Sequence, residues 1–215
     1  MNKKETLIKN LQGMKQYNNK DFIDLIKESF CTIKPSKRRN LIIILIITIL
    51  LYPIGLCIKS NNTLILLKEF VELTNEIIMA MFGILFTGYA LFQALINRNT
   101  LKILFLSRSK NENALFLEYN LYFFIMCILY ITSILINYII LFVLTLIEPG
   151  TFNFNDECKT IISWIFILIY LYCNIFTITE IKSFIVNLFR CFNISAVSTM
   201  IEELPNYDDN LREKK

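Results

Sequence analysis

Polar residues inside long apolar stretches are the first candidates for chemistry in this chain of 215 residues. Thr132, Ser133 and Asn137 lie together in one such stretch, and Asn174 lies in another. Hydroxyl and amide groups in an apolar setting can hydrogen-bond between helices, or they can line an ion pathway in an oligomer. The sequence leaves both interpretations open, as interhelical bonds or as a polar pore.

Small residues form a second group of candidates. Gly83 and Thr87 are four residues apart, and Gly88 and Gln93 follow them. This small-xxx-small spacing lets two helices approach closely, and a glutamine can bond across the contact. We therefore predict that these four residues pack helices together, either within the chain or at an oligomer interface, and a pore-lining role for Gly83, Thr87 and Gly88 is the alternative.

The sequence contains no motif that is typical of an enzyme. Histidine is absent, which excludes imidazole acid–base catalysis, serine–histidine triads and imidazole metal sites. The six cysteines are scattered and form no CxxC pair. We expect a protein that is not an enzyme and that needs neither a cofactor nor a metal.

The elements that position these residues are four uncharged stretches. They lack Asp, Glu, Lys and Arg and cover residues 41–58, 77–96, 121–147 and 160–179. A helix of about 20 apolar residues crosses a hydrocarbon layer of about 30 Å. Hydrophobic residues make up 55% of the chain and charged residues only 19%, which fits a membrane protein. The sequence predicts an all-α fold with an integral membrane four-helix bundle over residues 41–179.

Basic residues predict the orientation of the bundle. Nineteen of the 22 Lys and Arg residues lie in three segments, 1–40, 97–120 and 180–215. Because such residues collect on the cytoplasmic side, both termini and the inner loop 97–120 are expected there. We predict a multi-pass protein of the bacterial cytoplasmic (inner) membrane, with the lipid bilayer as its first partner.

Two features are expected on the outer side. Lys68, Glu69, Glu72 and Glu76 share a helical stripe, so the second helix is expected to begin near Thr63 and to stand above the bilayer for a turn or more. In addition, Cys57 and Cys158 are both expected near the outer surface. They could form a disulfide in an oxidising compartment, and free thiols are the alternative.

Both terminal segments are predicted to be amphipathic and cytoplasmic. In segment 1–40 an apolar helical face is followed by a basic run at the membrane surface. Segment 180–215 continues the fourth helix and ends in an acidic tail. The apolar faces either lie on the inner leaflet or dock a cytosolic protein partner. The docking candidates are Phe22, Ile26, Phe30, Phe189 and Phe192, and the basic run is Lys37, Arg38 and Arg39.

The formal charge of +4 does not predict nucleic-acid binding. No arginine-rich or aromatic-studded basic groove accompanies it. We therefore expect no direct contact with nucleic acid.

Two runs resemble a known family: GILFTGYALFQALINRNTLKILFLS, which begins at Gly83, and LFLEYNLYFF, from Leu115 to Phe124. The chain is similar to small bacterial four-helix membrane proteins found with anti-phage defence genes, and the membrane subunits of the Kiwa defence system are the nearest named case. There a glycine-containing second helix leads to a short amphipathic loop and an aromatic entry to the third. The resemblance implies an oligomeric envelope sensor that holds a cytosolic effector acting on nucleic acid. It carries over no functional residue.

These observations predict a non-enzymatic, homo-oligomeric sensor or anchor subunit that couples an envelope signal to a cytosolic effector. Two alternatives stay open at this stage. The chain could be a pore-forming membrane effector or ion channel, or it could be a bacteriocin immunity protein.

Overall fold

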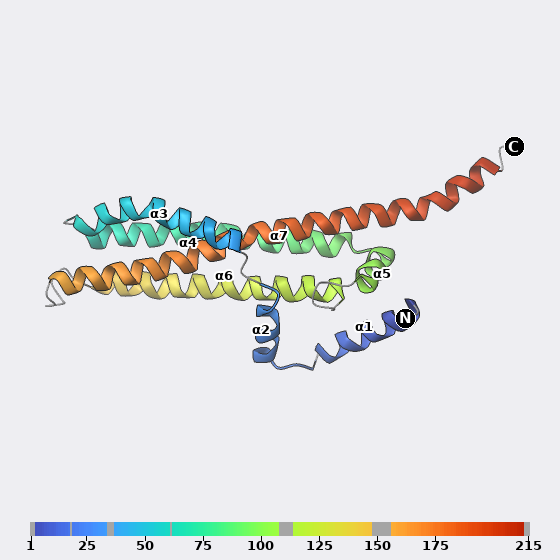
Figure 1. The fold of residues 1–215 in the computed structure, drawn as a ribbon, viewed down its shortest axis with the longest axis horizontal. Coiled ribbons are helices and arrows are strands. Elements are labelled where there is room, and N and C mark those ends of the chain that lie inside the picture. Colours follow the sequence, from blue (N-terminus) through green and yellow to red (C-terminus); the bar gives the residue numbers. More distant parts are fainter. Residues whose placement is uncertain are drawn as a thin grey trace. The chain divides into compact units, whose positions relative to one another are not determined.

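The structure is a computed structural model that describes residues 3–17, 19–33, 37–60, 62–107, 114–147 and 156–212 (Figure 1). Side chains are described in the same ranges except at 3–4, 156–159 and 201–212. Helices and no strands are present in the described part, so the predicted all-α class is confirmed. The helices are α1 (Lys3–Tyr17), α2 (Phe22–Phe30), α3 (Lys37–Lys59), α4 (Thr63–Leu95), α5 (Arg98–Leu106), α6 (Leu115–Leu146) and α7 (Asp156–Arg212).

Four of these helices, α3, α4, α6 and α7, are long and apolar enough to cross a membrane. Their isoleucine- and leucine-rich sequences form helices because each stretch offers many apolar contacts and few breaking residues. Two prolines lie inside these helices, Pro53 in α3 and Pro205 in α7. The four helices cover the four predicted spans to within one residue, since α4 ends at Leu95 and α6 at Leu146, and they support a multi-pass membrane protein.

The helices extend beyond the predicted spans. As expected, α4 begins at Thr63 and α7 continues the fourth span without a break. The helix α1 was not predicted, because its polar sequence shows no clear apolar periodicity. Its apolar residues Leu7 and Met14 pack on a cluster formed by other helices. Tertiary contact therefore stabilises a helix that its own sequence specifies weakly.

The chain forms two compact units. The four-helix unit consists of Pro35–Ile84 and Met126–Ile181, and the terminal unit consists of Met1–Lys34, Leu85–Ile125 and Lys182–Lys215. Helices α4, α6 and α7 contribute to both units, whereas α3 belongs to the four-helix unit alone. The predicted span 77–96 is divided between the units after Ile84, and the predicted domain boundaries stay a prediction.

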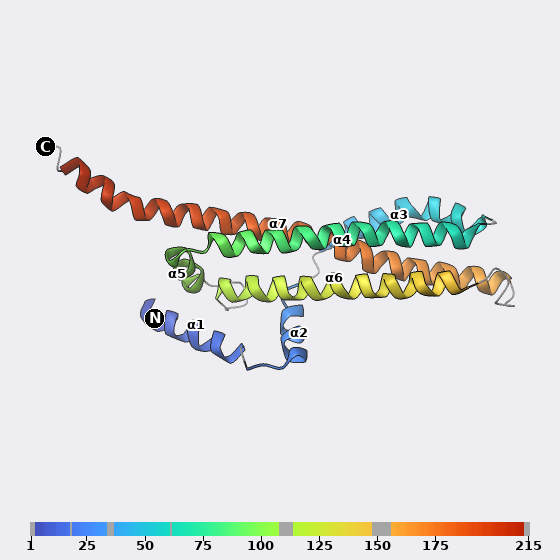
Figure 2. The same ribbon diagram turned by 180° about the vertical axis from the view of Figure 1, so that it is seen from behind.

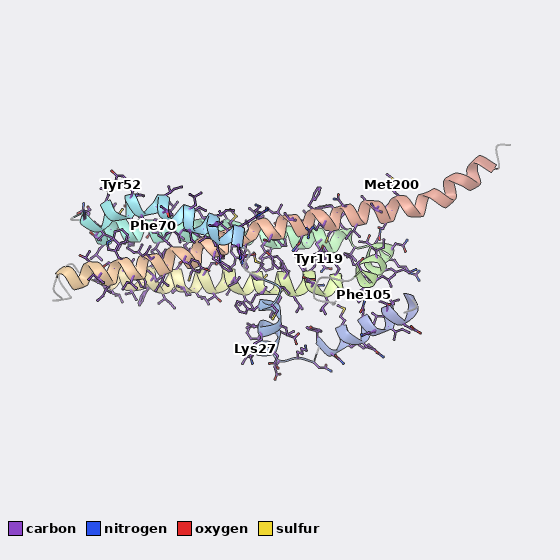
Figure 3. The ribbon with its side chains drawn as sticks, in the orientation of Figure 1. Lys27, Tyr52, Phe70, Phe105, Tyr119 and Met200 are labelled. Atoms are coloured by element: carbon purple, nitrogen blue, oxygen red, sulfur yellow. The ribbon has the colours of Figure 1, made fainter. Side chains whose placement is uncertain are left out.

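The core of the four-helix unit lies between α3 and α7. Its buried cluster consists of Ile43, Ile54, Ile167, Leu171 and Ile175. Around it the unit exposes a large apolar surface, with Tyr52 77% exposed and pointing away from the helices (Figure 3). A contiguous exposed apolar surface marks a region that contacts lipid or another protein. The surface is therefore of the kind that a bilayer covers.

The terminal unit has a core of its own. Phe105, Ala114, Leu117 and Leu121 form one buried cluster, on which α1 and α2 place apolar side chains. Helix α1 packs on α5. A second set of contacts is aromatic: the rings of Tyr89 and Phe123 stack with their centroids 3.7 Å apart. These contacts hold α1, α4, α5 and α6 together in this unit.

Candidate functional site in the helix bundle

An ion pair joins α3 to α7 inside the four-helix unit. The Arg39 guanidinium pairs with the Glu180 carboxylate, whose side chain is only 1% exposed. The guanidinium also lies over the ring of Phe176, 4.9 Å from its centroid. A buried carboxylate requires such a partner because burial removes its hydration. Arg39, predicted as a membrane-surface residue with Lys37 and Arg38, is thus part of the bundle, whereas the other two are exposed.

Amide and hydroxyl groups bond between α4, α6 and α7. The Asn137 side-chain amide donates to the Asn75 side-chain oxygen at 3.4 Å. The Ser133 and Thr177 hydroxyls lie 3.3 Å apart, and the Tyr130 hydroxyl donates to the Thr177 carbonyl at 3.2 Å. Asn137 and Ser133 therefore form hydrogen bonds between helices, which is one of the two interpretations that the sequence left open.

Two other polar candidates make no hydrogen bond to another helix in the described part of the chain. Asn174 is 5% exposed and donates to the carbonyl of Tyr170 in its own helix at 2.8 Å. Thr132 is exposed. Asn137 and Asn174 are thus both inside the chain, where neither side chain reaches the outer surface of the unit.

Contacts along α7 show which residues of the four-helix unit lie at the same height along the helix axes. Trp164 contacts Gly55 near one end of α3, and Glu180 pairs with Arg39 near the other, so α3 and α7 are antiparallel. These two levels are about 24 Å apart along the helix axis, at 1.5 Å per residue. The interval matches the apolar part of α3.

Helix α4 begins beside the end of α3, because the Thr63 hydroxyl donates to the Cys57 carbonyl at 3.1 Å. The two helices lie side by side in both ribbon views (Figures 1 and 2). Farther along, the ring of Phe70 contacts that of Tyr170, 6.2 Å between centroids. Helix α4 therefore runs antiparallel to α3 and in the same direction as α7. Because Phe70 is beside Tyr170, Glu72 of α4 lies at the same height along the helix axis as Tyr172 of α7. This height is midway between those of Trp164 and Glu180.

Glu69, Glu72 and Glu76 thus lie beside the apolar length of α3. All three side chains are exposed, and none of them takes part in an ion pair among the described residues. We expected these turns to stand clear of the apolar segments. The structure differs because the α3–α4 turn is short, so the first turns of α4 pack directly against the last turns of α3.

The predicted small residues are in different environments. A Cβ atom on Gly88 would lie 2.6 Å from a ring carbon of Phe184, so this glycine lets α4 and α7 approach within the terminal unit. A Cβ on Gly83 would meet no other atom within 4 Å. Thr87 and Gln93 are exposed. Gly88 therefore has a packing role that a described contact, the one with Phe184, explains.

Hydroxyl contacts that the sequence did not suggest fasten α7 in the terminal unit. The Thr100 and Ser198 hydroxyls lie 2.7 Å apart, and both residues are 1% exposed. The Ser195 hydroxyl donates to the carbonyl of Leu95 at 3.1 Å. The only signal in the sequence was the spacing of Ser195 and Ser198, which places both on one helical face.

The predicted docking residues are mostly exposed. Phe22 is 61% exposed, although its ring also contacts that of Phe124, and Phe30 is 50% exposed. Ile26 is half-buried. Phe189 and Phe192 are exposed in the C-terminal part of α7.

A small charged cluster ties α1 to α2 in the terminal unit. Lys20 forms an ion pair with Glu28, and its ammonium lies 3.9 Å from the centroid of the Tyr17 ring. The bond from Lys20 lowers the pKa of Glu28 below its usual value. Burial raises the pKa of Tyr17 to about 12, and its hydrogen bond with the Glu28 carboxylate adds to the effect.

The remaining sequence predictions concern cysteines and metals. Cys57 is half-buried, and the side chain of Cys158 lies outside the described residues, so their disulfide stays a prediction. The described side chains contain no group of three Cys, Asp or Glu residues that could hold a metal ion.

Comparisons of the chain with protein-family models, with curated proteins and with solved structures found no match.

Proposed function

We propose that this chain is a non-enzymatic, multi-pass subunit of the bacterial inner membrane that passes an envelope signal to a cytosolic protein partner, as in an anti-phage defence system. The chain works as a homo-oligomer with both termini in the cytoplasm. The observation that carries the proposal is the division of three helices between two units.

Helices α4, α6 and α7 each run without a break from the four-helix unit into the terminal unit. In this proposal the signal travels along these three helices, because each of them is helical on both sides of the boundary between the units. The ion pair of Arg39 and Glu180 fixes α7 to α3 just before α7 enters the terminal unit. A disturbance of the bilayer around α3 would therefore reach the terminal unit through α7.

The C-terminal part of α7 offers a surface for the partner. Its exposed apolar side chains are Ile185, Phe189, Val197 and Met200, with Met200 66% exposed and labelled in Figure 3. Such residues on one helix are typical of helix-in-groove recognition. The partner would cover this surface with a complementary apolar groove.

The test uses the full chain, expressed with its neighbouring genes and purified in mild detergent. We expect an intact mass equal to a multiple of 25.3 kDa plus a stoichiometric soluble chain. The substitutions Phe189→Asp and Met200→Asp should remove the soluble chain and abolish protection against phage. Lys182→Asp, an exposed charged position on the same helix, is the control and should leave both unchanged. Full protection by the Phe189→Asp, Met200→Asp protein would contradict the proposal.

The second candidate is a cation channel formed by several copies. The three exposed glutamates of α4 favour it, because rings of carboxylates select cations in channel proteins. In this proposal they face a water-filled path in the oligomer, and Glu72 lies near the middle of the bilayer.

Liposomes that contain only this protein test the channel. We expect them to release a cation-sensitive dye, and Glu72→Gln should reduce the flux. Glu28→Gln makes the same change of charge in the terminal unit and should not. Liposomes that stay tight at all protein densities would exclude this candidate.

A further inference from the structure

Helix α2 turns its apolar side away from the protein. Phe22, Ile23 and Phe30 are 61%, 64% and 50% exposed, and Ile26 on the same side is half-buried. At about 100° per residue, these four residues cover an arc of about 100° on the helix. We call this arc the apolar stripe of α2. A helix of a globular protein normally packs such a stripe on the core, so another surface has to cover this one.

The side of α2 that packs in the terminal unit is a different one. Ser29 is buried, and Leu25 packs on the cluster that contains Phe105. Both residues lie beyond the edge of the stripe that Phe22 forms. The terminal unit therefore holds α2 along one edge of the stripe and leaves most of the stripe exposed.

The same edge joins the stripe to an apolar surface of α6. The ring of Phe22 meets that of Phe124 edge to face, with 5.9 Å between the centroids. Phe124 is the fourth residue of the uncharged stretch 121–147 and shares one face of α6 with Ile131 and Leu135. Ile131 and Leu135 are exposed on that face. In the proposed topology the face contacts lipid, so the stripe of α2 continues a lipid-facing surface at its inner end.

The course of α2 suits a position at the surface of a bilayer. In both ribbon views α2 lies across the direction of the first turns of α6, which belong to the same unit (Figures 1 and 2). A helix that crosses a spanning helix in this way runs along the membrane plane. Its apolar stripe can then reach one leaflet over the whole length of the helix.

The charges of α2 are ordered as this position requires. Lys27, labelled in Figure 3, flanks the stripe next to Ile23, whereas Asp24 and Glu28 lie on the opposite side of the helix. Lys27 and Asp24 also form an exposed ion pair at 3.7 Å. A flanking lysine can reach lipid phosphates with its long side chain, and the carboxylates stay away from them.

We propose that α2 is an interfacial helix whose apolar stripe inserts into the inner leaflet of the bilayer. Acyl chains cover the stripe, and the Lys27 ammonium lies among the phosphates. The groove of a protein partner is the other cover known for such helices. Lipid is favoured because the stripe continues the α6 surface and because α2 lies across α6. The inference rests on the proposed membrane topology and adds a lipid contact outside the four spans.

The test uses the full chain alone in liposomes of phosphatidylethanolamine and phosphatidylglycerol, with its six cysteines replaced by alanine. A nitrobenzoxadiazole dye is attached to one new cysteine at a time. Ile23→Cys and Phe30→Cys place it on the stripe, and Asp24→Cys places it on the polar side. Phospholipids that carry a spin label high on the acyl chain should quench the dye at 23 and 30, and aqueous iodide should not. At 24 iodide should quench the dye and the lipids should not.

A second substitution shows whether the apolar side chains hold the stripe in lipid. Phe30→Asp should cause a loss of lipid quenching at Ile23→Cys, because it puts a charge on the stripe. Gln12→Asp makes the same charge change at an exposed position of α1 and should leave the quenching unchanged. Quenching of both stripe positions by iodide would show that the stripe faces water. Protection from both quenchers would show that protein covers it, and either outcome would overturn the proposal.

A dye at Leu135→Cys separates this inference from the topology. Leu135 is 57% exposed on α6, and a phospholipid with a spin label deep in its acyl chain should quench the dye there. If this position is quenched by lipid while 23 and 30 are not, the interfacial helix is wrong and the spans stand. If iodide and not lipid quenches the dye at 135, the topology fails and the inference fails with it.

Discussion

Arg39 at the start of α3 and Glu180 in α7 form a buried ion pair that links two segments far apart in the sequence. The pair marks the end of the apolar contact between these helices, since the cluster of Ile43 and Ile175 lies next to it. It therefore fixes the relative depth of α3 and α7.

We expect removal of either partner to destabilise the four-helix unit. Arg39→Met or Glu180→Leu leaves a buried charge without its partner, which costs about 3–5 kcal/mol of unfolding free energy. The double variant should recover most of the loss, because two apolar side chains replace two charges. Unfolding in a denaturing detergent can be followed by the fluorescence of Trp164, the single tryptophan. Lys37→Met, in the same first turn but exposed, is the control and should change stability little.

The two glycines of α4 should respond oppositely to alanine. In Gly88→Ala the new methyl group would overlap Phe184, and overpacking of this kind costs about 1–3 kcal/mol. Gly83→Ala has open space and should be neutral or stabilise the helix by up to about 1 kcal/mol. Thermal unfolding of the purified variants gives both values. Phe184→Leu combined with Gly88→Ala should recover part of the loss, and equal stability of the two single variants would contradict the packing described.

The hydroxyl pair of Thr100 and Ser198 should hold the C-terminal part of α7 on α5. Ser198→Ala removes one partner of a buried hydrogen bond, at a cost of about 1–3 kcal/mol. We expect faster proteolysis of α7 after residue 190, measured by the masses of the fragments. Met200→Ala changes an exposed side chain nearby and should leave the rate unchanged.

The Tyr17 hydroxyl should lose its proton at a higher pH than an ordinary tyrosine. Its pKa is raised to about 12, so the difference in tyrosinate absorbance between the wild type and Tyr17→Phe should appear near pH 12 and not near 10. Because the folded pKa is the higher one, the stability contributed by Tyr17 is complete below pH 10 and is lost as the pH rises through about 12. Glu28→Gln should move the transition to lower pH, although burial keeps it above 10. A transition near 10 in the wild type would show that Tyr17 is solvated.

The sequence was sufficient to predict a structural element where one physical constraint dominates. Long uncharged stretches must be helical to satisfy their backbone groups in an apolar setting, so the helices that contain spans 41–58 and 160–179 follow directly. The start of α4 at Thr63 follows in the same way, from the periodicity of its apolar residues.

The hydrogen-bond and ion-pair partners of individual side chains could not be predicted from the sequence. Asn137 was recognisable as a polar residue in an apolar stretch, but Asn75 lies in a polar stretch and had no distinguishing mark. Glu180 follows directly after an uncharged stretch, where a charge normally faces water. Whether it does depends on where α3 begins beside α7, and a single periodic pattern contains no information about the register between two helices.

The sequence by itself thus determined the helical class and the four long apolar helices, because hydrophobic length and charge distribution are local properties. Only the tertiary structure decided that Glu72 is level with the middle of the apolar part of α3, and that Gly88 faces Phe184 while Gly83 faces outward. These relations depend on the offset and rotation of one helix against another. Contacts such as those of Trp164 with Gly55 and of Arg39 with Glu180 fix them, and each contact joins residues from distant parts of the chain.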